Sequence, residues 1–172
     1  HLGFLTVARN MTKEQTSGLT YIDDKHPVQL MVKKAFEEMT DFKDPKFALD
    51  GCSAPNFQCS VRALARAMAN LSRPESHFYE RKVAIERLKD AVLQHPNLIA
   101  GEDRLCTNLI KRSKGRFIVK VGAEGVYTAI LFDHGLGVAI KIIDGAKRAA
   151  ECLIVAILAR LGLLGSDDQE ML

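Results

Sequence analysis

Apolar residues recur at helical spacing through the first two thirds of the chain. The run Leu2–Ala8 is apolar and predicts a helix. A second helix is predicted to begin at Pro27, because proline suits the first turn of a helix. Further helices are predicted over 60–71, where Ser60 can cap the first turn, over 76–94 and over 105–111.

The connections between these helices are rich in Gly, Pro, Asn and charged residues. We expect loops over Thr12–Asp24 and Asp41–Lys46, and a simple connection over Leu98–Asp103. After the short apolar run 47–49, the segment Asp50–Asn56 is so densely punctuated by Gly, Pro and Asn that no regular structure is expected there.

The pattern changes after residue 115. Three β-branched, apolar runs at 116–122, 126–132 and 136–143 are separated by short Gly-containing turns, which predicts antiparallel strands. An Ala- and Leu-rich helix is predicted over 146–163. The order is helices (1–115), a three-stranded meander (116–145) and a C-terminal helix (146–164), which defines an α+β fold within one domain spanning 1–172.

Composition excludes several classes of protein. The 172 residues include 47% hydrophobic and 26% charged residues, as in an ordinary soluble globular chain. A net charge of +3 gives no support to a nucleic-acid partner, and the apolar stretch 152–164 is too short for a membrane span and is interrupted by Arg160. Four cysteines without a signal peptide favour free thiols in the cytoplasm.

The loop Asp50–Asn56 is the densest cluster of chemically active side chains. It places a carboxylate, a thiol and hydroxyl or amide groups within seven positions, so it could present ligands to a metal. The structural alternative, which these residues alone favour, makes Cys52 a small buried filler and Asp50 a turn former. No CxxC or HxxxH pair accompanies the loop.

Lys120 is the second candidate, because its strand is otherwise apolar. Partial desolvation would suit it to proton transfer, and Lys120-Val121-Gly122 is similar to the Lys-Thr-Gly strand of serine β-lactamases. Alternatively, Lys120 points to solvent. Cys106 belongs to a weaker group near a predicted helix start, and the histidines at 26, 77, 95 and 134 are expected at the surface or at helix ends.

Several strings together resemble the L-asparaginase II family of rhizobial type. The most specific are Asp-Gly-Cys-Ser-Ala-Pro at 50–55 and Lys-x-Gly-Ala-Glu-Gly-Val-Tyr at 120–127. Supporting strings lie at 62–67, 95–101, 135–141 and 144–145. The resemblance covers nearly the whole chain, with Val121 replacing the small residue that is usual in the second string.

The resemblance implies a fold similar to serine β-lactamases and glutaminases, and hydrolysis of L-asparagine to L-aspartate and ammonia by an acyl-enzyme route. It implies that Lys120 is the catalytic lysine paired with a serine and that Cys52 is a zinc ligand, with Asp50 beside the metal. His1 would lie close to substrate, and Cys106 near the active site. Family members form homodimers.

The expected Ser-x-x-Lys nucleophile motif is absent, as are the Cys and Lys that precede the position of His1 in the family and would complete the zinc site. We therefore expect the chain to be the C-terminal half of such an enzyme, without the first strands of the sheet and inactive alone. Two alternatives remain: a non-catalytic binding or assembly module that keeps the fold, and a β-lactamase-like hydrolase, against which the loop at 50–55 argues.

Overall fold

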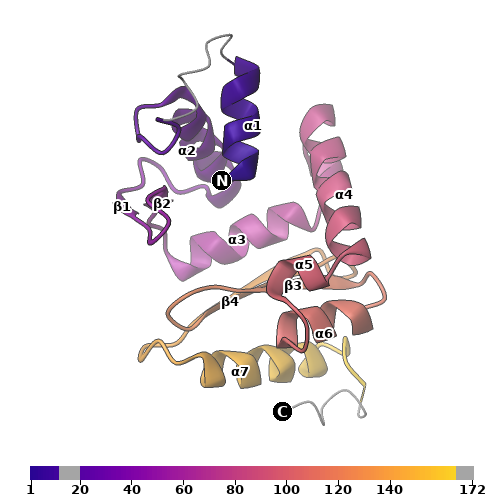
Figure 1. Ribbon diagram of the computed structural model, residues 1–172. Coiled ribbons are helices and arrows are strands. Elements are labelled where there is room, and N and C mark those ends of the chain that lie inside the picture. Colours follow the sequence, from indigo (N-terminus) through magenta and orange to yellow (C-terminus); the bar gives the residue numbers. More distant parts are fainter. Residues whose placement is uncertain (12–19, 166–172) are drawn as a thin grey trace. The chain divides into compact units, whose positions relative to one another are not determined.

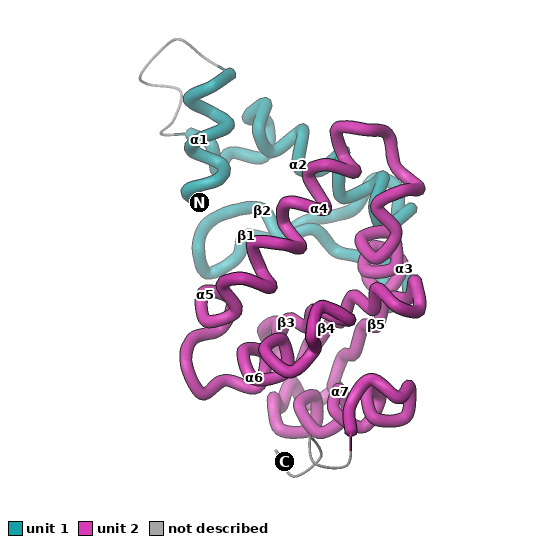
Figure 2. Tube along the Cα trace, turned by 90° about the vertical axis from the view of Figure 1, so that its right-hand side faces the viewer, with its two compact units in different colours: residues 1–63 teal, residues 64–172 magenta. Residues whose placement is uncertain are grey.

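A computed structural model of the chain describes residues 1–11 and 20–165. The chain divides into two compact units, residues 1–63 and 64–172, which are coloured separately in Figure 2. The predicted loop 12–24 lies largely outside the described residues, as does most of the polar tail after 165. That both units belong to one domain stays a prediction.

The first unit contains two helices, α1 (Leu2–Met11) and α2 (Pro27–Thr40), which confirms both sequence predictions (Figure 1). The start of α2 is fixed by His26, whose Nδ1 accepts a hydrogen bond from the Val28 amide at 3.2 Å, with Pro27 in the first turn. Asp41 ends the helix in the left-handed conformation (φ 54°). His26 is thus a capping residue, as expected.

A two-stranded antiparallel hairpin follows, formed by β1 (Phe47–Leu49) and β2 (Pro55–Phe57). The prediction that 50–56 contains no regular structure was therefore wrong at its end. Pro55 pairs with Leu49, which is compatible with proline because each strand of a two-stranded sheet has a free edge. The residues between the strands, including Cys52, form the turn.

The helices from α3 onward follow the predicted order, with two differences at their boundaries. Pro74–Ser76 forms a separate 3₁₀ turn and His77 is extended, so the long helix begins at Tyr79 and not at Ser76. Pro96 ends that helix but also opens a short one, where a simple connection was predicted. The helices are α3 (Val61–Leu71), α4 (Tyr79–Gln94), α5 (Asn97–Ala100), α6 (Leu105–Arg112) and α7 (Lys147–Arg160).

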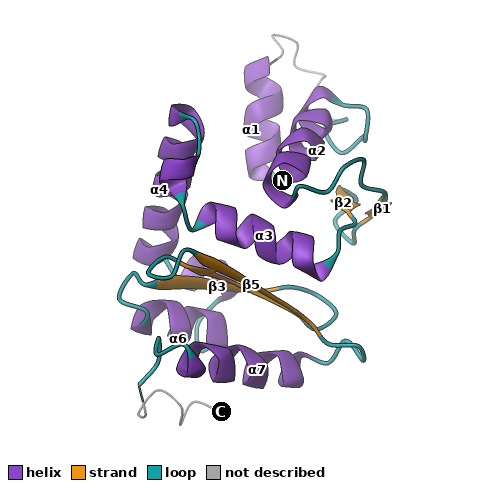
Figure 3. Ribbon diagram, turned by 180° about the vertical axis from the view of Figure 1, so that it is seen from behind, coloured by secondary structure: helices purple, strands orange, loops and turns teal. Residues whose placement is uncertain are grey.

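The three predicted strands form an antiparallel meander, so the α+β class is confirmed. β3 (Phe117–Val121), β4 (Val126–Leu131) and β5 (Leu136–Lys141) lie in that order, which makes β3 and β5 the edge strands. In the second unit, α6 and α7 cover one face of this sheet, and α4 with the body of α3 covers the other (Figure 3). The core lies mainly between the sheet and α6 and α7.

Within the described residues, no helix has both the length and the apolar character needed to cross a membrane. The core helix α7 runs from Lys147 to Arg160 and buries Ile154, Val155 and Leu158. The predicted apolar stretch 152–164 is therefore largely a core helix, as its sequence indicated.

Gly137 on β5 lets α3 approach the sheet at backbone distance. A Cβ at this position would lie 2.1 Å from the Ala65 carbonyl oxygen and 2.2 Å from the Ala69 amide nitrogen. Both atoms belong to the helix backbone, so neither can move aside without moving α3. One missing methyl group therefore sets the spacing between this helix and the sheet.

We expect Gly137→Ala to destabilise the protein by about 1–3 kcal/mol or more, because the added methyl must push α3 away from β5. Thermal unfolding followed by circular dichroism would measure this as a lowered Tm. Gly3→Ala is the control, because a Cβ there meets nothing within 4 Å. An unchanged Tm for Gly137→Ala would contradict the packing described above.

Candidate functional site

The residues predicted to form the site divide between the two units. His1, Asp50 and Cys52 lie in the first unit, and Cys106 and Lys120 lie in the second. The structure thus gives two local arrangements, a thiol–carboxylate turn and a lysine-bearing strand end, and each is described within its own unit.

Asp50 organises the turn that carries Cys52. The Asp50 carbonyl accepts a hydrogen bond from the Ser53 amide at 2.8 Å, and the Asp50 amide donates to the Ala54 carbonyl at 3.0 Å. One carboxylate oxygen accepts from the Gly51 amide at 2.8 Å, and the other lies 3.8 Å from the Cys52 thiol, which donates to it. Asp50 is therefore a turn former as well as a partner of the cysteine.

Cys52 is exposed, so the alternative in which it is a small buried filler was wrong. A thiol displayed on a tight turn is typical of a ligand or a reactive group more than of a packing residue. Its turn borders a cavity of about 410 Å³ lined by Thr20, Ile22, Asp23, Asp24, Phe47, Leu49 and Ser53.

The donor set around Cys52 would supply only part of a zinc site. Zinc in proteins takes three or four side-chain ligands, mainly Cys and His. Among residues 1–11 and 20–165, no three His, Cys, Asp or Glu side chains are grouped so that they could hold a metal ion. The described residues therefore do not complete a zinc site, although Cys52 with Asp50 fits one ligand and its hydrogen-bonded carboxylate.

His1 is exposed at the start of α1, and its Nδ1 is hydrogen-bonded to the Tyr21 hydroxyl. The two rings meet edge to face, with centroids 5.7 Å apart, and Phe4 also packs near Tyr21. Tyr21 was not predicted, because it lies in a polar segment that gives no periodic signal. This contact holds the His1 ring by one nitrogen.

Lys120 lies near the end of β3, opposite Thr128 on β4. Its side chain is exposed, which is the second of the two alternatives drawn from the strand pattern. The ammonium donates to the carbonyl of the next residue, Val121, at 2.6 Å, and the Thr128 hydroxyl donates to the Lys120 carbonyl at 3.2 Å. The lysine is thus accessible while its backbone is bound from the neighbouring strand.

Beneath this strand end lies a buried thiol–phenol pair. The Cys106 sulfur, at the start of α6, is 2.9 Å from the Tyr127 hydroxyl and accepts a hydrogen bond from the Val121 amide at 3.2 Å. Cys106 is 2% exposed and Tyr127 is fully buried. Burial, aided by the hydrogen bond to Cys106, raises the pKa of the Tyr127 phenol above its ordinary value.

The structure therefore brings Cys106 together with the strand that carries Lys120. That Cys106 lies near an active site stays a prediction. Tyr127 completes this arrangement but was not predicted as a functional residue. A tyrosine in a strand is ordinary core material from its sequence pattern alone, and only the pairing of Tyr127 with Val121 brings it to this position.

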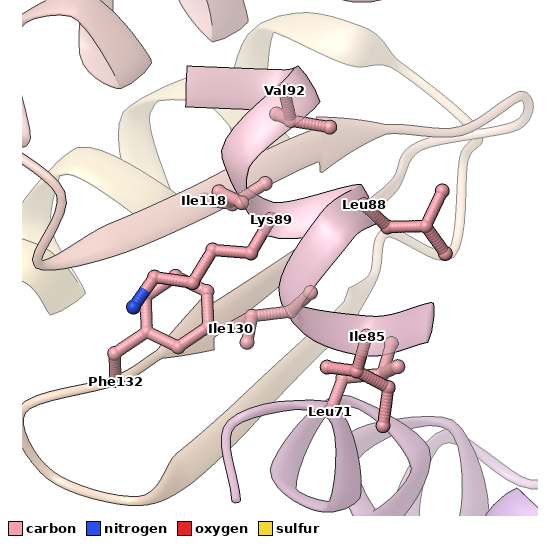
Figure 4. A pocket seen from close by; sticks show the side chains of 8 residues that line it. All are labelled: Leu71, Ile85, Leu88, Lys89, Val92, Ile118, Ile130 and Phe132. Atoms are coloured by element: carbon pink, nitrogen blue, oxygen red, sulfur yellow. The ribbon is translucent and has the colours of Figure 1, made fainter. Parts of the chain in front are cut away.

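A further cavity lies between α4 and the sheet (Figure 4). Its volume is about 100 Å³, and the Lys89 ammonium lies 4.0 Å from the centre of the Phe132 ring at its side. Apart from Lys89, its lining is entirely apolar, so it offers no nucleophile or acid–base pair. It is lined by Leu71, Ile85, Leu88, Lys89, Val92, Ile118, Ile130 and Phe132.

Comparison with known families identifies the chain. The model of the L-asparaginase II family matches residues 1–172, the whole of the sequence. The chain belongs to the L-asparaginase II family, which bears out the resemblance carried by the strings at 50–55 and 120–127. No relative among curated proteins matches it.

The buried phenol predicts a loss of stability at alkaline pH. The unfolded chain would ionise Tyr127 near pH 10, whereas the native state keeps it protonated to higher pH. The stabilisation from this group is therefore complete below about pH 10 and declines as the pH rises further. Tyr127→Phe removes this contribution.

The measurement is the free energy of unfolding in urea at pH 8 and at about pH 11, for the wild type and for Tyr127→Phe. We expect the advantage of the wild type over the variant to shrink at the higher pH. Tyr79→Phe is the matched control, because Tyr79 is 75% exposed. An advantage of equal size at both pH values would show that Tyr127 does not behave as a buried phenol.

Proposed function

We propose that the chain is the C-terminal part of an L-asparaginase that hydrolyses L-asparagine to L-aspartate and ammonia. The family match over the full sequence carries this proposal. The exposed side chain of Lys120, near the end of a strand that is hydrogen-bonded to β4, supports it. The sequence contains no Ser-x-x-Lys motif. We therefore assign the nucleophilic serine to a region of the enzyme that precedes these residues.

In this mechanism Lys120 accepts and returns the proton in each step. The Lys120 side-chain nitrogen accepts the proton of the serine hydroxyl as the serine oxygen attacks the side-chain amide carbon of asparagine. The C–N bond then breaks, and Lys120 returns the proton to the departing nitrogen, which leaves as ammonia. Water next attacks the acyl ester, gives its proton to Lys120 and releases L-aspartate, and the serine regains its hydroxyl proton.

Cys52 is proposed as one ligand of a zinc ion, with Asp50 as the carboxylate that orients its sulfur. This rests on the exposed thiol and its hydrogen bond to Asp50, together with the family string at 50–55. Because the described residues do not complete the site, the remaining ligands are assigned outside them. Zinc held there would supply a Lewis acid for polar groups of the substrate. His1 is proposed to lie at the substrate site.

A non-catalytic binding module is the second candidate, and the absence of a Ser-x-x-Lys motif is the observation that favours it. Such a module would keep the fold and serve binding or assembly without turnover. The intact protein, meaning these residues together with the region that precedes them, distinguishes the two candidates by its activity.

In the intact protein, we expect Lys120→Ala to lower kcat for L-asparagine by at least about 100-fold, since proton transfer by a positioned side chain contributes about 10²–10⁴-fold. Ammonia release under saturating substrate measures this. Lys111→Ala, which removes another exposed lysine in the second unit, should leave kcat within about twofold of the wild type.

The 172-residue chain alone should release no more ammonia than its own Lys120→Ala variant. Near-normal turnover by Lys120→Ala in the intact protein would remove Lys120 from the mechanism. Turnover by the isolated wild-type chain above its variant would contradict the assignment of the nucleophile to another region. An intact protein that binds asparagine without hydrolysing it would support the binding module.

We expect Cys52→Ala to lower the zinc content of the purified intact protein by more than half, because one direct ligand is lost. Metal analysis of the protein after dialysis measures the zinc-to-protein ratio. Cys152→Ala is the matched control, since Cys152 is also an exposed free cysteine but lies on α7. Equal zinc content in Cys52→Ala and the control would exclude Cys52 as a ligand.

A further inference from the structure

The end of β3 poses a hydrogen-bonding problem at an edge of the sheet. The Gly122 amide donates to the Val126 carbonyl at 2.8 Å, and the Phe132 amide donates to the Arg116 carbonyl at 2.9 Å. The backbone amide and carbonyl groups of the even-numbered residues of β3 therefore point toward β4. The peptide groups of Val121 therefore point to the outer edge of β3, where no further strand pairs with it among residues 1–11 and 20–165.

Both edge-facing groups of Val121 are nevertheless bound, and each has a different partner. The Val121 amide donates to the Cys106 sulfur at 3.2 Å, and the Val121 carbonyl accepts from the Lys120 ammonium at 2.6 Å. The same residue thus joins a buried thiol to the exposed lysine. A shift of Val121 would move its carbonyl, and with it the hydrogen-bond acceptor of the Lys120 ammonium.

The position of Cys106 is in turn fixed by Tyr127. The phenol oxygen lies 2.9 Å from the sulfur, inside a core that excludes water. Tyr127 is opposite Val121 in the register, so the pair connects α6 to two adjacent strands. A buried hydroxyl with this one described hydrogen bond is costly to leave unpaired, which favours the observed arrangement strongly.

We propose that Tyr127 and Cys106 are positioning residues for the reaction: as a buried clasp they fix Val121, and through its carbonyl they fix the ammonium of Lys120. This inference rests on the proposed catalytic role of Lys120. Both side chains are buried, so the role assigned to them involves no contact with substrate. Because small displacements of reacting groups cost large factors in rate, a loosened clasp lowers kcat while substrate binding stays intact.

The test uses Tyr127→Phe and Cys106→Ala in the intact protein, both of which remove hydrogen-bonding groups without adding bulk. We expect kcat for L-asparagine to fall by about tenfold in each variant, with KM within about twofold of the wild type. Cys106→Ser, which keeps a polar group at the position, should recover part of the loss. Tyr79→Phe and Cys152→Ala are the matched controls, because both side chains are exposed.

Hydrogen exchange gives a readout that does not depend on activity. The amide of Val121 should exchange about five- to tenfold faster in Cys106→Ala, since a hydrogen bond contributes about 1 kcal/mol, whereas the amide of Gly122, which is bound to β4, should not change. Mass spectrometry of peptides that cover 117–122, or NMR of the assigned amides, measures this difference.

Unchanged kcat in both variants with unchanged exchange at Val121 would overturn the proposal, as would a rise in KM at constant kcat. If Lys120→Ala is inactive but Tyr127→Phe is as active as the wild type, the positioning role alone fails. If Lys120→Ala retains normal turnover, the proposed function fails too, and the positioning role fails with it.

Discussion

The hydrogen bond from the Val121 amide to the Cys106 sulfur is the contact on which the proposed chemistry of the second unit depends. Edge strands leave backbone groups without a partner, and proteins satisfy or protect them in various ways. Here a helix supplies a sulfur atom from its first turn. The same contact closes the edge, joins α6 to the sheet and places the carbonyl that receives Lys120.

The two faces of the sheet contribute differently to this arrangement. The face toward α6 and α7 holds Phe117, Tyr127 and Leu131, which are fully buried and pack the strands into the core. On the other face, Gly137 allows the backbone of α3 to lie directly against β5. Lys120 lies on that same face, two strands away, where it stays exposed. A well-packed backbone under an accessible side chain suits the proton-transfer role proposed for Lys120.

Much of this architecture could be predicted from residue patterns. The three strands and the helices at Pro27 and Ala146 follow from periodicity, turn glycines and capping residues, which act locally. The predicted boundaries were wrong at two prolines, because a proline that ends one element can also begin or join another. Pro96 ends α4 but also starts α5, and Pro55 is accepted in β2 because that strand has a free edge. Ser76 belongs to a 3₁₀ turn, whose short range no helical pattern distinguishes.

In the candidate site, contacts between residues close in sequence could be predicted, whereas contacts between distant residues could not. Asp50 and Cys52 are two positions apart, so their hydrogen bond depends only on the turn and could be anticipated from the sequence. Tyr127 and Cys106 are 21 positions apart, and they meet because the register of β3 with β4 and the packing of α6 bring them together. Neither residue carries a sequence signal for this contact. A residue that acts on Lys120 through a neighbour's backbone is visible only in three dimensions, whereas Lys120 itself is distinguished by its charge in an apolar strand.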